Sequence, residues 1–324
     1  MKLLERTIVV RDRRFLLRVE TSHDIEDYRK YEDLRDELWG LPDDHLAGTR
    51  NMMCENVFHE GASLFIGAFA EAVGGGFAVD AEHLAAFSYG FVGVRDKELG
   101  FRDPANLRFY SQYLGVRKPY QSHGLGIFLK EFQREMVLDI LGVSTVICTY
   151  DPLTGVNAQR NVRYFGMDVL EYRVAHYGEY GGLLNRPDVP SDRFLMSWDL
   201  KRKAGRPDYD FKAALAAPGP IRTARRRVAG KTAELELEVV ESFDPDAAAD
   251  PLLVRIPLDF YRMLRETDVD DGDVRRIPLD WRMASRAVFQ ALFARGFRVV
   301  DFRKAEGPSP ANYYVLSRAA LPGR

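Results

Sequence analysis

The stretch from Val116 to Gln133, VRKPYQSHGLGIFLKEFQ, joins an apolar run to a long amphipathic run through two glycines. The preceding run, RFYSQYLGV, is typical of a strand, and after Gly124 apolar residues recur at spacings of three and four, which predicts a helix. The apolar run STVICTY then predicts a second strand, which ends at Asp151-Pro152. A strand, helix, strand crossover of this kind favours a mixed α/β fold.

The chain before this crossover predicts an antiparallel start. RFLLRVE is typical of a strand, and a helix is expected from His23 to Leu38, opening at Ser22. A second short helix is expected from Asn51 to His59. ASLFIGAF and AAFSYGFVGV, separated by the turn-rich AVGGGFAVDAEH, predict two antiparallel strands. After the crossover, NAQRNVRYFG predicts a short helix that ends at Gly166.

Composition limits the class of protein. A chain of 324 residues with 46% hydrophobic residues is too long for most single-core domains, so two domains are expected. The net charge of -2 shows no general affinity for nucleic acid. Cys54 and Cys148 lack metal-type spacing, which favours a reducing compartment and no zinc site. With neither a secretory signal nor an apolar run of membrane-spanning length, we expect a cytoplasmic protein without a membrane partner.

The two glycines have two interpretations. A turn that ends a strand and begins a helix presents unpaired N–H groups and the positive end of the helix dipole, which suits a phosphate. The alternative is an ordinary connection, and glycine spacing alone does not decide between them. GLGIFL lacks the third glycine of the dinucleotide fingerprint, and the chain contains no GxSxG motif. The triplet Gly230-Lys231-Thr232 does not complete a P-loop, because Arg225 stands where that motif has its first glycine. A phosphate here therefore requires another type of fold.

The pattern V-x-x-x-x-Q-x-x-G-x-G, formed by Val116, Gln121, Gly124 and Gly126, resembles the acyl-CoA pyrophosphate loop of the GNAT superfamily of N-acyltransferases. TYDPLTGVNAQRN, the following YFG, the pair Tyr177-Gly178 and DRFLMSWDL extend the resemblance to a bacterial subgroup of predicted GNAT acetyltransferases. The resemblance covers residues 1–200. It implies a GNAT-type mixed, mostly antiparallel central sheet flanked by helices, and acetyl-CoA or another acyl-CoA as co-substrate, without a metal.

The resemblance also implies which groups hold the acyl-CoA. The backbone around Leu114 and Val116 would bind the pantetheine arm, and one N–H would face the thioester carbonyl as an oxyanion donor. Arg117 or Lys118 would add charge at the rim, unless both are simply solvated. The pyrophosphate would be bound by the amides of Gln121, Ser122, His123, Gly124, Leu125 and Gly126.

In many GNAT enzymes a tyrosine on the helix after the next strand protonates the leaving thiolate. Counting forward from Asn157 places Tyr164 at that position, whereas counting back from Gly166 places Val162 there. The alternative role of Tyr164 is that of a packing aromatic near a helix end. Asn157 and Asn161, at i and i+4, share a helix face, and one would reach CoA or substrate unless Asn157 only caps the helix.

No general base follows from the sequence. Glu55, His59 and Glu60 lie before the first central strands, in a region that shapes the acceptor pocket of GNAT proteins. Tyr110 and Gln112 occupy positions on the strand before the loop where histidines are expected in the nearest relatives. Each of these side chains has a structural or solvated role as its alternative. A water relay would also serve, because several GNAT enzymes need no dedicated base.

Beyond Leu200, the basic segment at residues 201–231 predicts a linker or a solvated edge at the domain boundary. A nucleic-acid arm is the alternative, which no aromatic interleaving supports. Residues 232–324 predict four strand-like runs and a helix from Trp281 to Arg295, with IPLD at both Ile256 and Ile277. No second glycine loop accompanies them. We expect a C-terminal α+β degenerate GNAT-like half-domain that packs on the first domain or builds a homodimer.

Two classes of function follow. The first is an acyl-CoA-dependent N-acyltransferase that moves an acetyl or succinyl group to the amine of a small molecule or amino acid. The second is a GNAT-fold CoA-binding or regulatory protein without turnover. The acceptor and the acyl chain are open, because nothing in the loop recognises the acyl end.

Overall fold

The computed structural model describes residues 4–24, 26–40, 62–178, 181–307 and 309–321. The chain divides into two compact units, Met1–Cys148 with Asp199–Lys201, and Thr149–Trp198 with Arg202–Arg324. The chain passes from one unit to the other inside strand β6 (Thr145–Tyr150), and again on each side of Asp199–Lys201. The predicted helix from Asn51 to His59 and the candidate bases Glu55, His59 and Glu60 lie outside the described residues, as does Cys54.

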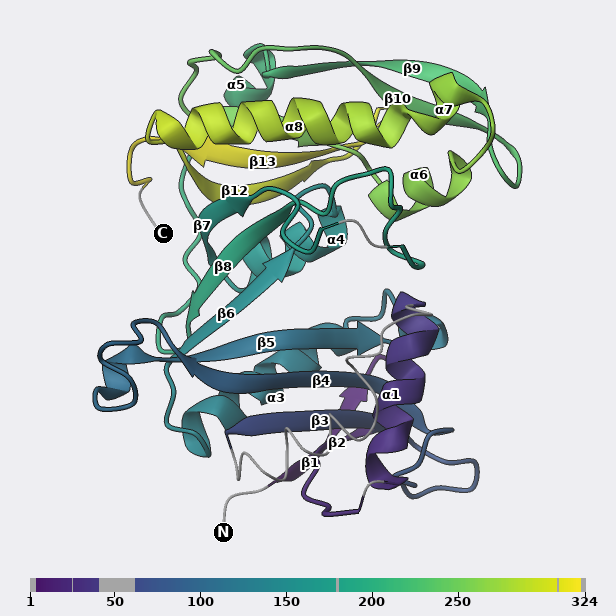
Figure 1. Cartoon of the computed structure of the whole chain (residues 1–324), viewed down its shortest axis with the longest axis vertical. Coiled ribbons are helices and arrows are strands. Elements are labelled where there is room, and N and C mark those ends of the chain that lie inside the picture. Colours follow the sequence, from purple (N-terminus) through teal and green to yellow (C-terminus); the bar gives the residue numbers. More distant parts are fainter. Residues whose placement is uncertain (1–3, 25, 41–61, 179–180, 308, 322–324) are drawn as a thin grey trace. The chain divides into compact units, whose positions relative to one another are not determined.

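The first unit contains the antiparallel start that the sequence predicts (Figure 1). Its elements are β1 (Glu5–Val10), β2 (Arg13–Val19), α1 (Glu26–Trp39), β3 (Ser63–Ala70), β4 (Leu84–Val94), η1 (Pro104–Asn106), β5 (Leu107–Val116), η2 (Lys118–Tyr120), α3 (Leu125–Asp139) and the first part of β6. Strands β1 to β5 pair with their neighbours in antiparallel fashion, and β5 pairs with β6 in parallel. The predicted crossover through α3 is therefore confirmed.

Strand alternation gives the sheet of the first unit two buried faces. Phe87 and Tyr89 of β4 belong to one hydrophobic cluster with Tyr28, Tyr31 and Leu34 of α1. Ser88 lies between them and therefore faces the opposite side of the sheet. On that side the buried hydroxyl of Ser111 donates a hydrogen bond of 3.1 Å to Gln133 of α3. The two helices therefore cover opposite faces of the central strands.

Helix α1 begins three residues later than the sequence predicts. Ser22 does not cap the helix; its hydroxyl accepts a hydrogen bond from the amide of Asp24. The carboxylate of Asp24 in turn accepts one from the amide of Glu26. These two short side chains build successive turns before the first helical residue, because they compete with the backbone for its amides.

The second unit combines the end of the predicted GNAT-like region with the C-terminal residues. Its elements are α4 (Gly155–Ala158), the π-helix η3 (Gln159–Tyr164), β7 (Asp168–Arg173), β8 (Arg193–Asp199), α5 (Phe211–Ala216), β9 (Ile221–Ala229), β10 (Glu234–Phe243), β11 (Leu252–Ile256), α6 (Phe260–Glu266), α7 (Gly272–Arg275), α8 (Ile277–Ala294), β12 (Arg298–Ala305) and β13 (Ala311–Ser317). Strand orders are β1-β2-β3-β4-β5-β6-β8-β7, β10-β9 and β11-β13-β12. The predicted mixed, mostly antiparallel sheet flanked by helices is confirmed.

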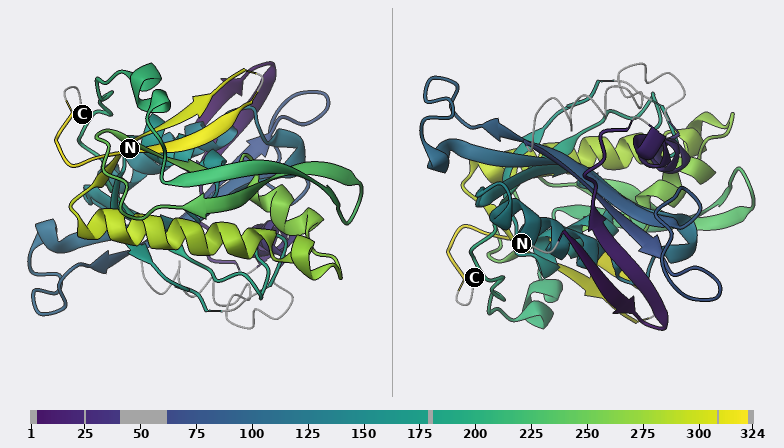
Figure 2. Two further views of the ribbon diagram at one scale, coloured as in Figure 1. Left: turned by 90° about the horizontal axis from the view of Figure 1, so that it is seen from above. Right: turned by 90° about the horizontal axis from the view of Figure 1, so that it is seen from below.

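The segment predicted to be a linker, residues 201–231, is partly structured. It contains α5 and also β9, which pairs in antiparallel fashion with β10. Basic residues on β9 face acidic residues on β10, with Arg225 opposite Glu238 and Arg227 opposite Glu236. Opposite charges across a strand pair are stabilising, which the composition of the basic strand alone does not show. Figure 2 shows α8 lying along this hairpin, and α8 packs against β10.

Phe194 of β8 is at the centre of the core of the second unit. Its ring lies 5.0 Å from that of Phe289 and 5.9 Å from that of Phe293, both on α8, measured between ring centroids. Tyr314 of β13 contacts it at 5.4 Å. The C-terminal elements thus share one core with β8.

Candidate functional site

The turn between β5 and α3 is built by residues with a left-handed backbone. Gly124 caps α3 with φ of 93°, and Ser122 also has a positive φ, 63°. Glycine adopts this conformation without steric cost, whereas serine does so less readily. The side chain of Gln121 closes the turn, because its Nε2 donates a hydrogen bond of 2.7 Å to the carbonyl of Val116.

The amides of this turn form a cradle of hydrogen-bond donors. The amide of Gln121 donates to the carbonyl of Lys118, so the cradle begins one residue later than expected. A Cβ added to Gly124 would meet no atom within 4 Å, so space remains beside the backbone. These donors at a helix start fit an anionic phosphate. None of the described residues accepts a hydrogen bond from the amides of Ser122, His123, Gly124, Leu125 and Gly126.

The strand before the turn has an open edge. Strand β5 pairs with β6 only at Phe109 and Tyr110, so none of the described residues of β6 pairs with Ser111–Val116. The amide of Arg117 donates to the carbonyl of Ala85 on the β4 side. Because donors alternate along an antiparallel ladder, the N–H groups of Leu114 and Val116 point away from β4. They point toward the open edge, where the sequence resemblance places a pantetheine arm.

A β-bulge shapes the middle of β5. Tyr113 is opposite Tyr89 whereas Ser111 is opposite Gly90, which leaves Gln112 as an extra, exposed residue. The bulge approaches Gly90 closely, because a Cβ there would lie 2.4 Å from the carbonyl oxygen of Tyr110. Bulges of this kind redirect backbone groups next to functional sites. Sequence reasoning missed this feature, and its one signal was Gly90 in β4.

The charges around the turn differ from expectation. Arg117 is bound elsewhere, to Glu37 at 3.0 Å and to the carbonyls of Ala81 and Glu82. Lys118 is exposed in η2 and remains the candidate for the rim charge. Sequence reasoning missed two further arginines of the β1–β2 turn. Arg11 and Arg13 place a guanidinium nitrogen 3.5 Å from the carbonyl of Ser122 and 3.4 Å from that of Pro119, respectively.

Tyr164, the predicted acid, lies in the second unit at the end of η3. Its side chain is 41% exposed, and its ring contacts that of Phe165 at 4.9 Å. Val162, the other possible register position, is buried and carries no proton to transfer. The exposed phenol therefore favours the count forward from Asn157. Tyr164 is the last residue of the π-helical turn Gln159–Tyr164, and turns of this kind occur frequently at functional sites.

Asn157 and Asn161 have different environments. Asn157 donates to the hydroxyl of Thr154 at 3.0 Å and accepts a hydrogen bond from Arg160 at 2.6 Å. It does not cap α4, whose N-cap is Thr154. Asn161 is 2% exposed, and none of the described residues donates to its Oδ1. A buried acceptor without a donor is a feature that a ligand or an ordered water would satisfy.

Titratable candidates for the base remain few. Tyr110 packs against Phe91 with ring centroids 5.6 Å apart, and Gln112 does not titrate. His176 follows β7, and burial together with the guanidinium of Arg173 lowers its pKa, so its imidazole is neutral near pH 7.

Across the described ranges no group of three or more His, Cys, Asp or Glu side chains has metal-binding geometry. No helix in the described part of the chain is long and apolar enough to cross a membrane.

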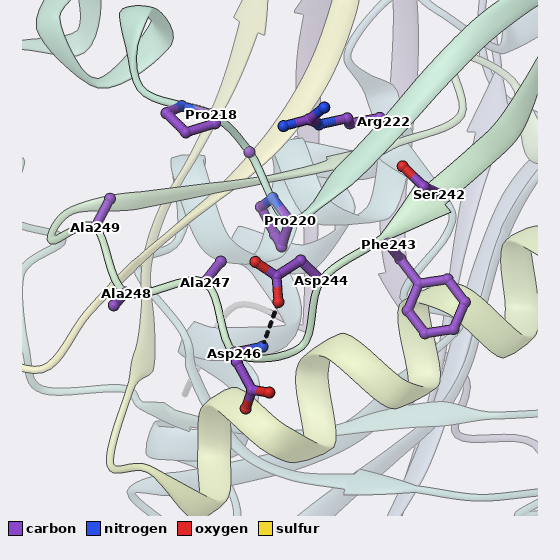
Figure 3. Close-up of a pocket in the computed structure, with 11 residues that line it drawn as sticks. Pro218, Pro220, Arg222, Ser242, Phe243, Asp244, Asp246, Ala247, Ala248 and Ala249 are labelled. Carbon is purple, nitrogen blue, oxygen red and sulfur yellow. Dashed lines mark hydrogen bonds between the residues drawn. The ribbon is translucent and has the colours of Figure 1, made fainter.

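The second unit also contains an open cavity of about 400 Å³ at the ends of β9 and β10 (Figure 3). Its lining includes two prolines and three alanines, together with Asp244, Asp246 and Arg222. Arg295 of α8 fixes one wall by donating to the carbonyls of Pro245 and Ala247. None of the predicted site residues lines this cavity.

No protein-family model and no curated protein matches the sequence. Solved structures that this chain resembles include the ribosomal-protein-S5-alanine acetyltransferase from Vibrio fischeri. The two are 10% identical, the match covers 61% of this chain and 97% of that chain, and the TM-score is 0.43. The ribosomal-protein-S18-alanine N-acetyltransferase from Escherichia coli has 13% identity, coverage of 60% and 99%, and a TM-score of 0.39. An acetyltransferase of the GNAT family from Streptococcus pneumoniae is 13% identical, with coverage of 56% of this chain and 97% of that chain and a TM-score of 0.38. Likeness at this level does not decide activity or acceptor.

Proposed function

We propose that the chain is an acyl-CoA-dependent N-acyltransferase of the GNAT type. The observation that carries the proposal is the cradle of amides from Ser122 to Gly126 beside the open edge of β5. The cradle fits the pyrophosphate of acyl-CoA, and the N–H groups of Leu114 and Val116 fit its pantetheine arm. Lys118 supplies charge at the rim, and no metal enters the proposal.

The chemistry follows from this arrangement. The neutral acceptor amine attacks the thioester carbonyl carbon, a C–N bond forms, and the C–S bond breaks. An N–H group on the open edge of β5 stabilises the carbonyl oxygen as it becomes negative. Tyr164 gives its proton to the departing thiolate, and the amine loses its proton to water or an unassigned base. We assign Asn157 and Asn161 to binding of CoA or of the acceptor.

The acceptor that we propose is the amine of a small molecule or amino acid, and the acyl group is acetyl or succinyl. A panel of acetyl-CoA and succinyl-CoA against amines, amino acids and short peptides, followed through release of free thiol, tests this directly. Thiol release that requires both an acyl-CoA and an acceptor supports the transferase. Binding of CoA without thiol release for any pair would identify a CoA-binding protein without turnover, and absence of both would overturn the proposal.

A further inference from the structure

The C-terminal elements hold the segment that carries the proposed acid. This segment runs from Tyr150, at the end of β6, to Tyr164 at the end of η3, and lies within the second unit. Four buried or half-buried contacts reach it from α8, β12 and β13. Each joins residues far apart in the sequence, and together they fix the start, the first helical residue and the last turn of the segment.

The start of the segment is fixed by a tyrosine pair. Tyr314 of β13 donates a hydrogen bond of 2.9 Å to the carbonyl of Pro152. Because that hydroxyl has only one proton, Tyr150 is the donor in the 3.0 Å bond between the two phenols. Both side chains are buried, and burial raises the pKa of Tyr314 well above its ordinary value, so its proton stays in place near pH 7.

The next residue, Asp151, determines how the chain turns into α4. Its Oδ1 accepts from the amide of Leu153 at 2.9 Å, and its carbonyl accepts from the amide and the hydroxyl of Thr154. Its other carboxylate oxygen is bound by the guanidinium of Arg282 on α8. Arg193 lies 3.5 Å from the same oxygen. Asp151 therefore connects α8 to the turn that begins the helix.

Two more contacts fix the helix itself. Gly155, the first residue of α4, lies so close to Asn312 of β13 that an added Cβ would be 2.5 Å from its Nδ2. Arg163, one residue before the proposed acid, donates a hydrogen bond of 2.7 Å to the buried carboxylate of Asp301 on β12.

Arg282 is the most costly of these anchors to bury. Its side chain is 1% exposed and lies over the ring of Phe260 at 5.2 Å. Burial alone lowers the pKa of its guanidinium, but the carboxylate of Asp151 more than offsets this and raises it above its ordinary value. None of the described residues accepts a hydrogen bond from its Nε or Nη1. A buried charge that leaves donors unpaired gives little stability for its cost, which favours a role in fixing geometry.

We propose that Arg282 is a positioning residue for the proposed reaction: through Asp151 it sets the turn that orients α4 and η3, and with them Tyr164. This inference rests on the proposed function for its kinetic part. Its structural part, the ordering of residues 150–164 by Arg282, stands independently of any activity.

The test compares full-length Arg282→Lys, Arg282→Met and the double variant Asp151→Asn with Arg282→Gln, which replaces the ion pair by a neutral hydrogen-bonding pair. Arg276→Ala, an exposed residue at the start of the same helix, is the matched control. Hydrogen exchange of peptides spanning residues 150–165 is the readout that needs no activity. We expect exchange there to rise at least about 10-fold in Arg282→Met, less in Arg282→Lys, and not at all in Arg276→Ala.

In the kinetic part, kcat should fall about 10-fold or more in Arg282→Met, and by a larger factor than the affinity for CoA, because the segment carries the proposed acid as well as Asn157 and Asn161. The double variant keeps the test valid if Arg282→Met does not fold, and should recover part of both losses. Exchange equal to that of the wild type in a folded Arg282→Met, or in a folded Arg282→Lys, would overturn the inference. Faster exchange in a protein whose wild type shows no turnover would support the structural part and reject only the proposed function.

Discussion

Gln121 donates its side-chain Nε2 to the carbonyl of Val116 over 2.7 Å, so two positions of the loop motif contact each other directly. The side chain of the motif glutamine therefore bonds to the protein backbone. It closes the turn, and it occupies the carbonyl of Val116, which would otherwise face the open edge of β5. The glycines then complete the turn that Gln121 begins. This relationship predicts how each residue of the loop responds to substitution.

Gln121→Met keeps the length of the side chain and removes the donor. A hydrogen bond of this type contributes about 1 kcal/mol to folding stability, so we expect a small fall in melting temperature. We also expect the affinity for CoA to fall by up to about fivefold, because the turn is no longer held in its binding conformation. Isothermal titration calorimetry measures the affinity. Affinity equal to that of the wild type would show that the turn is held by its backbone alone.

Gly124→Asp places a side chain and a negative charge in the open space beside the amide cradle. We expect CoA affinity to fall at least about 10-fold, because the carboxylate occupies and repels the position of the phosphates. Gly142→Asp is the matched control, since Gly142 also has a positive φ and open space around it, and follows the other end of α3. Both variants carry the backbone strain of about 1–2 kcal/mol, so only a difference in CoA binding between them concerns the cradle. Equal affinities would reject the cradle.

Tyr164→Phe retains the ring that contacts Phe165 and removes the phenolic proton. Loss of a general acid lowers turnover by about 10²-fold, and CoA binding should not change. Steady-state assays of thiol release, combined with calorimetry, separate the two effects. If turnover is unaffected, Tyr164 is a packing residue, and a water protonates the thiolate.

Phe289→Ala tests whether the C-terminal elements share a core with residues 149–198. The buried ring contacts Phe194, Tyr172 and Tyr314, so its removal should cost about 3–5 kcal/mol of unfolding free energy. Met283→Ala on the same helix, at a half-exposed side chain, should cost at most about 0.5 kcal/mol. Denaturant titration followed by tyrosine and tryptophan fluorescence measures both. Small and equal effects would indicate that α8 contributes no core.

Glu266→Gln tests stability against pH. The carboxylate accepts hydrogen bonds from the hydroxyl and the amide of Thr232, which lower its pKa in the folded protein. The unfolded chain therefore binds a proton more readily, so this stabilisation is complete above the unfolded pKa, about 4.3, and is lost as the pH falls through the folded pKa. We expect the wild type to melt higher than the variant near pH 7 and the gap to narrow below about pH 4. A gap that is constant with pH would exclude a contribution from this ionisation.

Local patterns in the sequence determined much of this protein. The spacing of apolar residues predicts α3 and α8, the alternating and apolar runs predict β2 to β6, and the motif from Val116 to Gly126 predicts the loop and its helix start. These features depend on residues within a few positions of one another, because helix periodicity, turn conformation and capping are short-range properties.

The tertiary structure alone decided the rest. The bulge at Gln112, the open edge of β5, the arginines beside Ser122 and the contact of Arg282 with Asp151 all join segments that are far apart in the sequence. Strand register and ion-pair partners follow from which side chains fill a common core, and that depends on packing across the whole sheet. For the same reason the sequence did not show where the C-terminal residues pack. The apolar face of α8 predicts that a partner surface exists, and only the folded chain shows that β7 and β8 provide it.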